Sequence, residues 1–384
     1  MLSQPPAPPP GNQLRLILLV TALAAAGRGW AQEPLPPAGV ATRPAQPAAA
    51  DPAALGRETV TDIYKSLSLP GLGAAVVRDG KIVLEEYVGF ADLEHREPVE
   101  DSSLFRVGSC SKLLTATAMV RLKQKGKLDI DAPLSRYLGS VPEDKAAITA
   151  RQIAGHLGGF AHYGRGDYLN ATHYEDVKET LPRYLGTPLV APPGTKYAYS
   201  SYGYNVLGAV LQAAARREFR AVVQSEVTGP LGMSHTQAED SSRPPRKRAH
   251  LYSKDDKDAF IDAPATDLTD RWPSGGFLST AADLARLGAG VLQPKFLDPN
   301  AREEMFTLQK TADGAETKVG LGWRVARDEA GRRYVHHGGD SVGGRAFLLV
   351  YPDEKIAVAL TTNLTFASLG EKEARRLAEC FLRR

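Results

Sequence analysis

Residues 109–126 read SCSKLLTATAMVRLKQKG, a run of small and apolar residues that closes on a glycine. This pattern predicts a helix that begins near Ser109 and ends at Gly126. Because positions three apart lie on one helix face, the side chains of Ser109 and Lys112 can touch. The free N–H groups at a helix start favour developing negative charge, and a partly desolvated lysine can accept a proton. The segment therefore predicts a nucleophilic serine paired with a lysine, although a capping serine beside an incidental lysine has the same spacing.

A second segment, residues 192–204, reads PPGTKYAYSSYGY and is typical of a turn that leads into a helix. At such a corner the phenol of Tyr199 can point into a cleft. A tyrosine acts as a base only beside cations that stabilise its phenolate, because its ordinary pKa is near 10. The competing interpretation is that Tyr199 is a packed aromatic.

A third segment, residues 336–340, reads HHGGD and lies between two strand-like runs. Its glycines, Gly338 and Gly339, allow the backbone to approach a ligand closely, and the N–H of Asp340 can point at an oxyanion. Neighbouring residues of a strand face opposite sides, so only one of the two histidines can face a site. A tight hairpin with two surface imidazoles is the alternative.

The two ends of the chain carry the strand signals. Residues 53–66 predict an amphipathic helix, and residues 73–87 predict a hairpin that turns at Asp79-Gly80. Three more strand-like runs and a closing helix follow near the C-terminus, at residues 321–327, 346–351, 356–362 and 368–382. We therefore expect an α+β fold, in which an antiparallel sheet flanked by the terminal helices carries an inserted, mainly helical region. The sheet lobe should comprise about residues 53–105 and 300–384, and the helical lobe about residues 106–299.

Composition narrows the class of protein. The chain has 384 residues, of which 43% are hydrophobic and 24% charged, and its net charge is +3. This profile fits a folded globular protein, and the near-neutral charge argues against nucleic acid as a partner. One basic run, RPPRKR at residues 243–248, precedes the acidic run DDKD and is interpreted as a solvated loop. The two cysteines, Cys110 and Cys380, lack zinc-binding spacing, and we expect both to be buried thiols. No metal or other cofactor is implied.

The N-terminus has the pattern of a processing segment. Residues 16–26 form an apolar stretch that is too short to cross a bilayer comfortably, and Ala31 ends an acceptable cleavage site. The sequence therefore predicts a signal peptide, a Pro/Ala-rich tether and a folded domain, at residues 1–31, 32–52 and 53–384. We expect an exported protein, periplasmic or secreted, with no membrane span after cleavage. An uncleaved membrane anchor is the alternative.

Together the three segments resemble the serine beta-lactamase-like superfamily, specifically its class C-related branch of DD-peptidases, D-aminopeptidases, family VIII carboxylesterases and mitochondrial serine beta-lactamase-like proteins. That family carries the motifs SxxK, YxN and KTG, the last often replaced by HxG. They correspond here to Ser109 with Lys112, Tyr199-Ser200-Ser201 and His337-Gly338-Gly339. Three further stretches also match, GKLDIDAPLSRYL from Gly126, HLGG from His156 and SGGFLSTAADLARL from Ser274. The resemblance spans about residues 58–365 and looks closest to the mitochondrial-type members.

The resemblance implies a serine hydrolase that cleaves an amide or ester bond through an acyl-enzyme on Ser109. In such an enzyme Lys112 and Tyr199 share the serine proton and later protonate the leaving group. The N–H groups of Ser109 and Asp340 form the oxyanion hole, and His337 adds a polar wall or supports Tyr199 electrostatically. Substrate-binding positions are Gly338, Gly339 and Ser201. The expected partner is a small-molecule or peptide substrate.

Two departures from the family pattern bear on specificity. Ser201 replaces the asparagine that holds the substrate amide in true beta-lactamases, and His337 replaces the lysine that helps to bind the substrate carboxylate. We therefore expect weak beta-lactam turnover and favour a peptidase-type activity. A carboxylesterase of the same fold is one alternative, and a non-catalytic penicillin-binding or scaffold protein is the other. Specificity should lie in loops such as residues 160–190 and 234–272, which carry no readable code for the substrate.

Other motifs are weaker. Residues 339–343, GDSVG, match the GxSxG motif of α/β-hydrolases, but a strand rather than a helix is predicted after Ser341, and no histidine follows His337. His162 and His173 lack metal-ligand spacing, and we expect them in a substrate loop or at the surface. Residues 170–172, NAT, form a glycosylation sequon that matters only in a host that glycosylates secreted proteins.

Overall fold

A seven-stranded antiparallel sheet is built from the two ends of the chain in the computed structural model, which describes residues 51–164 and 166–382. The strand order is β3-β2-β1-β12-β11-β10-β9. These strands are β1 Gly71–Arg78, β2 Lys81–Asp92, β3 Glu97–Pro98, β9 Arg324–Arg327, β10 Arg333–Ser341, β11 Gly344–Tyr351 and β12 Ile356–Thr362. The predicted α+β fold is confirmed. The predicted signal peptide, and the predicted tether up to residue 50, lie outside the described residues.

Pairing between β1 and β12 joins the two ends of the chain. The two strands are antiparallel from the Leu72–Thr362 pair to the Arg78–Ile356 pair. β1, β11 and β12 are buried along nearly their whole length, which explains their continuous apolar sequences. Between β1 and β2, Asp79 and Gly80 both have positive φ, as the predicted two-residue hairpin turn requires.

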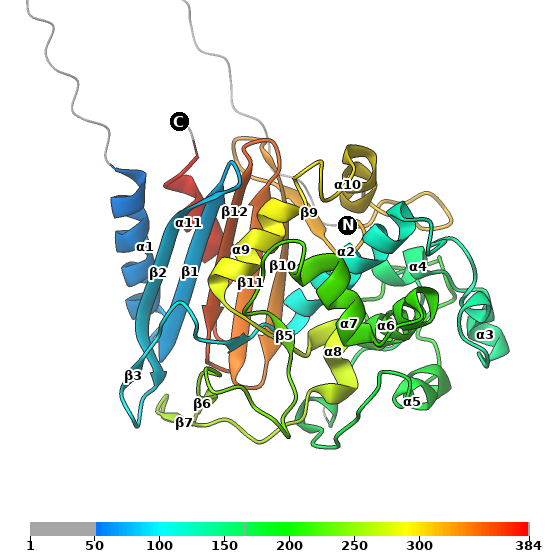
Figure 1. Ribbon diagram of the computed structural model, residues 1–384, viewed down its shortest axis with the longest axis horizontal. Helices are drawn as coiled ribbons and strands as arrows, with labels where there is room; N and C mark the ends of the chain where they lie inside the picture. The colour runs from blue at the N-terminus through cyan, green and yellow to red at the C-terminus, as the bar shows by residue number, and fades with distance from the viewer. Residues whose placement is uncertain (1–50, 165, 383–384) are drawn as a thin grey trace, which may run out of the picture. The chain divides into compact units, whose positions relative to one another are not determined.

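Helices cover both faces of this sheet (Figure 1). On one face lie α1 Pro52–Ser66 and α11 Glu371–Glu379, which contact each other and the strands β2, β11 and β12. On the other face α9 Ala281–Gly290 packs against β1, β11 and β12. Buried apolar side chains fill each of the two layers, so the sheet lies between two hydrophobic clusters.

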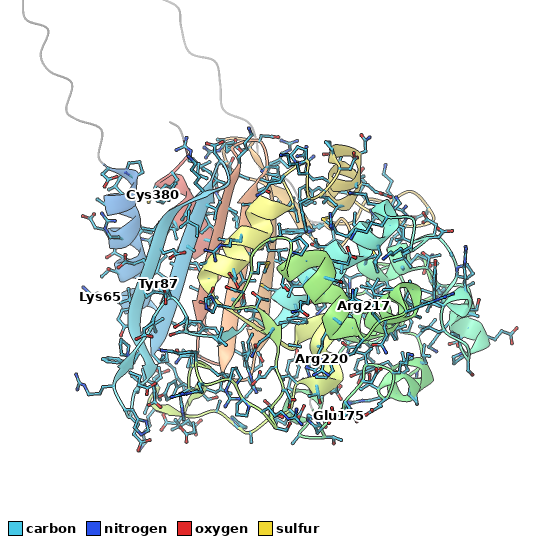
Figure 2. All side chains as sticks on the ribbon, in the orientation of Figure 1. Lys65, Tyr87, Glu175, Arg217, Arg220 and Cys380 are labelled. Carbon is cyan, nitrogen blue, oxygen red and sulfur yellow. The ribbon has the colours of Figure 1, made fainter. Side chains whose placement is uncertain are left out.

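The two cysteines have different environments. Cys110 is fully buried, as predicted, and burial raises the pKa of its thiol to about 12. Cys380 follows the last residue of α11 (Figure 2), where its sulfur lies 3.4 Å from Thr59 Oγ1 of α1. Because this position is at the edge of the helix layer, Cys380 is only partly buried and the prediction of a buried thiol is wrong there.

The region between the two ends of the sheet is mainly helical. Its helices are α2 Ser111–Gln124, α3 Glu143–Ala146, α4 Ala150–Ala154, α5 Leu181–Gly186, α6 Ser201–Ala215, α7 Phe219–Val223, α8 Trp272–Gly275 and α10 Pro299–Phe306. It also contains short strands, β4 Phe105–Arg106, β5 Gln237–Ala238, β6 Tyr252–Lys254, β7 Phe260–Asp262 and β8 Phe277–Ser279. Within residues 51–164 and 166–382, no helix has the length and apolar character needed to cross a membrane.

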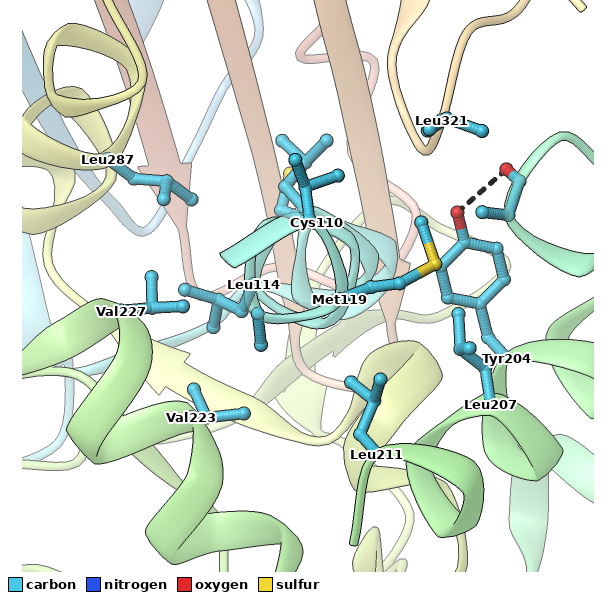
Figure 3. Close-up of a cluster of buried hydrophobic side chains, with 14 of the residues drawn as sticks. Cys110, Leu114, Met119, Tyr204, Leu207, Leu211, Val223, Val227, Leu287 and Leu321 are labelled. Carbon is cyan, nitrogen blue, oxygen red and sulfur yellow. Dashed lines mark hydrogen bonds between the residues drawn. The ribbon is translucent and has the colours of Figure 1, made fainter. Parts of the chain in front are cut away.

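Helix α2 lies at the centre of this region (Figure 3). Every residue from Ser111 to Val120 is buried, so the helix has no solvent-facing side over that stretch. Side chains such as Leu207 of α6 and Val223 of α7 surround it. Within the same cluster, the Tyr204 hydroxyl donates a 3.0 Å hydrogen bond to the carbonyl of Ala154.

Several helix and strand boundaries depart from the prediction. The helix expected from Ser109 begins at Ser111, because residues 108–110 form a 3-10 turn, here η1 Gly108–Cys110. The strand expected from Leu321 begins at Arg324, because Gly322 takes a positive φ of 87° and turns the chain. The closing helix is shorter than predicted at both ends.

Candidate active site

Ser109 and Lys112 meet where the sheet and the helical region join. Ser109 lies in η1, Lys112 lies in the first turn of α2, and Lys112 Nζ is 3.2 Å from Ser109 Oγ. The predicted contact therefore exists, although Ser109 belongs to a 3-10 turn rather than to the α-helix. Strand β10 and helix α8 both contact η1, so this turn is held from two sides.

Lys112 is fully buried and has three oxygen neighbours. Besides Ser109 Oγ, its Nζ lies 2.9 Å from Ser201 Oγ and 2.8 Å from the carbonyl oxygen of Ser274. Burial lowers the pKa of Lys112 well below its ordinary value, and the nearby charge of Arg324 lowers it further. A neutral amine has two N–H bonds and one lone pair. If the Ser274 carbonyl and Ser201 accept the two N–H groups, the lone pair is left for the hydroxyl proton of Ser109.

Tyr199 stands beside this pair. The centroid of its ring is 5.0 Å from Lys112 Nζ. The next residue, Ser200, is the N-cap of α6, and its Oγ accepts a 2.8 Å hydrogen bond from Gly203 N. This cap fixes the loop-to-helix corner that the sequence predicts. Burial raises the pKa of Tyr199 above its ordinary value, so at neutral pH the side chain is a neutral phenol with a proton to donate.

His156 stabilises the loop-to-helix corner through hydrogen bonds with Ala198 and Ser200. Its Nδ1 accepts a 3.1 Å hydrogen bond from Ser200 N, and its carbonyl accepts a 2.9 Å hydrogen bond from Ala198 N. The imidazole lies 4.4 Å from the Tyr199 ring, centroid to centroid. Because Nδ1 accepts and burial lowers the pKa of the ring well below its ordinary value, the single proton lies on Nε2. The sequence match at HLGG marked this residue without indicating its role.

Two glycines bring the backbone of β10 against η1. A Cβ at Gly339 would lie 1.9 Å from the carbonyl oxygen of Val107 and 2.8 Å from Ser109 N. Gly108 has a φ of 49°, and a Cβ there would lie 2.4 Å from the carbonyl oxygen of Asp340. Only glycine permits this approach, which places the N–H groups of Ser109 and Asp340 on neighbouring backbones, as an oxyanion hole requires. The sequence assigned close approach to Gly338 as well, but a Cβ at Gly338 would meet the ring of Phe347 instead.

His337 is a neutral imidazole. Its Nδ1 lies 2.6 Å from the carbonyl oxygen of Gly338, which can only accept, so Nδ1 carries the proton. Burial lowers the pKa of His337 well below its ordinary value, and the positive charge of Arg324 lowers it further. His337 therefore fits the expected polar wall but supplies no positive charge to Tyr199. A positive charge comes instead from Arg324, whose guanidinium carbon is 5.8 Å from the Tyr199 ring centroid.

These groups border a cavity of about 300 Å³. Most of the predicted site residues line it, namely Ser109, Tyr199, Ser201, His337, Gly338 and Asp340. Lys112 lies beneath Ser109, and Gly339 acts through its backbone. The sequence did not identify several other lining residues, including Tyr163, Tyr168, Arg271, Ser274 and Arg324. The matching stretch from Ser274 and the general expectation that residues 160–190 and 234–272 shape the site pointed toward some of them.

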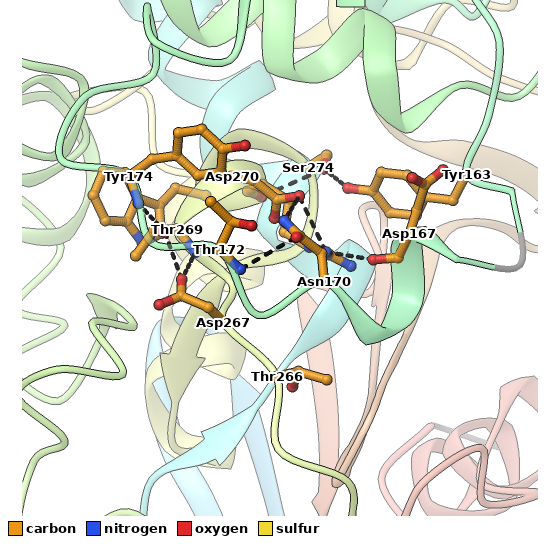
Figure 4. Close-up of polar contacts among 12 residues, drawn as sticks. Tyr163, Asp167, Asn170, Thr172, Tyr174, Thr266, Asp267, Thr269, Asp270 and Ser274 are labelled. Carbon is orange, nitrogen blue, oxygen red and sulfur yellow. Dashed lines mark hydrogen bonds and ion pairs between the residues drawn. The ribbon is translucent and has the colours of Figure 1, made fainter. Parts of the chain in front are cut away.

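A buried polar network supports one wall of the cavity (Figure 4). Tyr163 Oη lies 2.5 Å from Ser274 Oγ, in the same residue whose carbonyl accepts from Lys112. Arg271 Nε donates to Asp270 at 2.6 Å, and Asn170 Nδ2 donates to the same carboxylate at 2.9 Å. The side-chain nitrogen that would carry a glycan at this sequon is therefore engaged in a partly buried hydrogen bond.

The weaker motifs have different places in the structure. Ser341 ends β10 and is followed by the hairpin to β11, so the rejection of a nucleophile elbow there is confirmed. His162 lines the cavity, where its Nδ1 accepts from Ser201 N at 3.3 Å, and His173 lies 2.8 Å from Asp267. The part of the chain that the structure describes has no group of three or more His, Cys, Asp or Glu side chains arranged for a metal ion.

The hydroxyl of Ser109 contacts a buried lysine, and the N–H groups of Ser109 and Asp340 lie on neighbouring backbones. This arrangement places the fold in the class of serine hydrolase-like proteins. The model of the beta-lactamase family matches residues 56–380. The chain belongs to this family, and the resemblance inferred from the sequence is confirmed.

Relatives that match along most of the chain include mitochondrial proteins. The human mitochondrial serine beta-lactamase-like protein LACTB is 25% identical, with 78% of this chain and 72% of its own length aligned. Protein flp from Staphylococcus aureus strain N315 is 21% identical over 77% of this chain and 60% of its own length. The LACTB matches support the mitochondrial-type branch of the family.

Solved structures share the fold. The D-amino acid amidase from Ochrobactrum anthropi SV3, complexed with D-phenylalanine, has a TM-score of 0.75 at 19% identity and covers 86% of this chain and 99% of its own. The octameric penicillin-binding protein homologue from Pyrococcus abyssi has a TM-score of 0.70 at 22% identity and covers 82% of this chain and 73% of its own.

Proposed function

We propose that this protein is a serine hydrolase that cleaves an amide or ester bond through an acyl-enzyme on Ser109. The observation that carries the proposal is the contact between Ser109 Oγ and the buried amine of Lys112. Burial lowers the pKa of this amine and so favours its neutral form, and a neutral amine within hydrogen-bond distance of a hydroxyl can act as its base.

The geometry supports the following acylation step. Ser109 Oγ attacks the substrate carbonyl carbon while its proton passes to Lys112 Nζ. The carbonyl oxygen becomes negatively charged and is stabilised by the N–H groups of Ser109 and Asp340. As the intermediate collapses, the bond to the leaving group breaks, and the proton held by Lys112 returns to that group through Tyr199. Water then hydrolyses the ester on Ser109 by the same steps in reverse order.

A peptidase-type activity is favoured, with a carboxylesterase as the alternative. An amine must be protonated as it leaves, whereas an activated phenol leaves readily as an anion. The two donors beside Ser109, the buried Lys112 amine and the Tyr199 phenol that lines the cavity, suit the more demanding leaving group. Replacing Tyr199 by Phe should therefore reduce amide hydrolysis by about 10²-fold or more and affect p-nitrophenyl esters less.

The decisive experiment is labelling with a fluorophosphonate probe, followed by mass spectrometry of the modified peptide. We expect the label on Ser109 and its loss in the Lys112→Ala variant. Ser341→Ala is the matched control, because Ser341 is another serine that lines the cavity, and labelling should persist in it. A folded protein that does not label would favour the non-catalytic binding or scaffold alternative.

Export remains part of the proposal. It rests on the apolar stretch at residues 16–26 and the small residues that follow it. N-terminal sequencing of the protein purified from its own cells tests it. A mature chain that begins near residue 32 is expected, whereas a mitochondrial location like that of the LACTB relatives would contradict it.

A further inference from the structure

Phe366, in the loop after β12, has an unusual conformation for an exposed side chain. It is 55% exposed, and its φ is 46°. A left-handed backbone is unfavourable for a bulky residue, whereas glycine or asparagine adopts it readily. An exposed phenylalanine also gains little from the core. Strain of this kind persists where the surrounding structure imposes it, and it clusters at ligand sites.

The loop that carries Phe366 is fixed to the catalytic strand. Thr365 Oγ1 accepts a 2.7 Å hydrogen bond from Gly343 N, in the turn that joins β10 to β11, and lies 2.9 Å from the carbonyl oxygen of Tyr252. Asn363 Nδ2 donates to the carbonyl of His250 at 3.1 Å. Phe366 is therefore held at a defined position relative to the strand that contains Asp340.

Phe366 also extends a wall of the catalytic cavity. Its ring meets that of Tyr168 edge to face, with centroids 5.9 Å apart and planes at 75°. Tyr168 lines the cavity, together with the apolar side chains of Leu268, Val342 and Phe347. The apolar surface thus continues from the lining of the cavity to an exposed aromatic ring at its rim.

The charged groups nearest this rim compensate each other. Arg345 and Asp340, which both line the cavity, form an ion pair. Tyr168 itself sits in a turn whose first residue, Asp167, forms an ion pair with Arg183. The rim therefore combines two positioned aromatic rings with little uncompensated charge, a surface suited to an apolar group.

We propose that Tyr168 and Phe366 form a subsite for an apolar, alkyl or aromatic substituent of the substrate. This inference rests on the proposed function, because it concerns a substrate cleaved at Ser109. The substituent lies on either the acyl group or the leaving group of the substrate. Both groups can carry an apolar chain, and two ester series that lengthen one group at a time distinguish them. In an apolar pocket, each added methylene group raises the affinity or kcat/KM by about fourfold.

The test uses the full chain and two ester series, one from acetyl to hexanoyl p-nitrophenyl esters and one from methyl to hexyl acetates. In the Phe366→Gly variant we expect the preference for the longer member of one series to fall about tenfold, while activity on the short esters is retained. The thermal midpoint should stay the same or rise, because glycine relieves the left-handed backbone. Phe366→Asn, which also tolerates this φ, should behave like the glycine variant. Val83→Thr, at another exposed apolar residue on β2, is the matched control and should leave both preferences unchanged.

A binding measurement separates failure of this inference from failure of the proposed function. In the Ser109→Ala background, N-hexanoyl-glycinamide and N-acetyl-glycinamide are compared by ligand-observed NMR, with and without Phe366→Gly. Tighter binding of the hexanoyl compound that is lost with Phe366→Gly supports the subsite even if the wild-type protein does not turn over esters. Unchanged chain-length preferences in both ester series and in binding would overturn the subsite while leaving labelling of Ser109 intact.

Discussion

Replacing Gly339 by alanine should disable the site by moving one strand. The added Cβ would lie 1.9 Å from the carbonyl oxygen of Val107, whereas ordinary contact begins at 3.4 Å. Strand β10 or the η1 turn must therefore shift by about 1.5 Å, the difference between these two distances. This shift separates the N–H of Asp340 from that of Ser109.

The magnitude follows from the loss of one oxyanion donor. Misplacing a catalytic group by about 1 Å costs about 10²-fold, and removing one oxyanion-hole donor costs about 10²- to 10³-fold. We therefore expect kcat/KM, or the rate of fluorophosphonate labelling at Ser109, to fall about 10²- to 10³-fold in Gly339→Ala. The overpacked contact should also destabilise the fold by about 1–3 kcal/mol.

The assay compares labelling rates at equal concentrations of folded protein, with folding checked by circular dichroism. Gly338→Ala is the matched control on the neighbouring residue, because a Cβ there meets only the Phe347 ring, at 3.1 Å, and the Arg345 side chain. Its rate should fall less than about tenfold, since side chains adjust more easily than backbone. A Gly339→Ala variant that labels within about threefold of the wild-type rate would refute the account of the oxyanion hole.

Three further outcomes are expected. Because burial lowers the pKa of Lys112, kcat/KM should rise as pH increases through that lowered pKa and then stay level. The arginine in the Lys112→Arg variant remains protonated, so this variant should not be labelled by the fluorophosphonate at any pH. Arg106→Met should destabilise the protein by about 3–5 kcal/mol in urea unfolding, because it leaves the buried carboxylate of Glu239 without its bidentate partner at 2.7 and 3.0 Å. His156→Leu should cost about 1–3 kcal/mol of stability by leaving Ser200 N unpaired, and should slow labelling of the catalytic serine about tenfold. His156→Asn, which keeps an acceptor and tolerates a positive φ, should restore most of that labelling rate, whereas equal rates in the two variants would exclude a positioning role.

The parts of the site that depend on short-range spacing were predictable from the sequence. Ser109 and Lys112 are three residues apart, so helical geometry alone brings them together. The pair of glycines before Asp340 indicated close backbone approach, although only Gly339 makes it. The strands β1, β2, β11 and β12 were likewise visible as apolar runs bounded by turns, whereas β10 carries too many polar residues and glycines to show that pattern.

The parts that depend on long-range packing were not predictable. Arg324 reaches Tyr199 only because β9 pairs with β10, the active-site strand, and a single arginine in a strand carries no such signal. Ser274 acts through its carbonyl, which every residue has. The proton on His337 Nδ1 depends on a carbonyl acceptor, Gly338, whose orientation only the folded hairpin defines.

The pairing of β1 with β12 has a consequence for the order of folding. Strand β1 ends at Arg78 and its partner begins at Ile356, so the sheet cannot close until nearly the whole chain has left the ribosome. Contacts of such long sequence separation form slowly, and unpaired strand edges invite aggregation in the meantime. During synthesis the edge of the β1–β2 hairpin that pairs with β12 therefore stays unpaired until β12 emerges. A nascent chain released before residue 356 would contain Ser109 and Lys112 yet lack the strand that joins the two halves of the sheet.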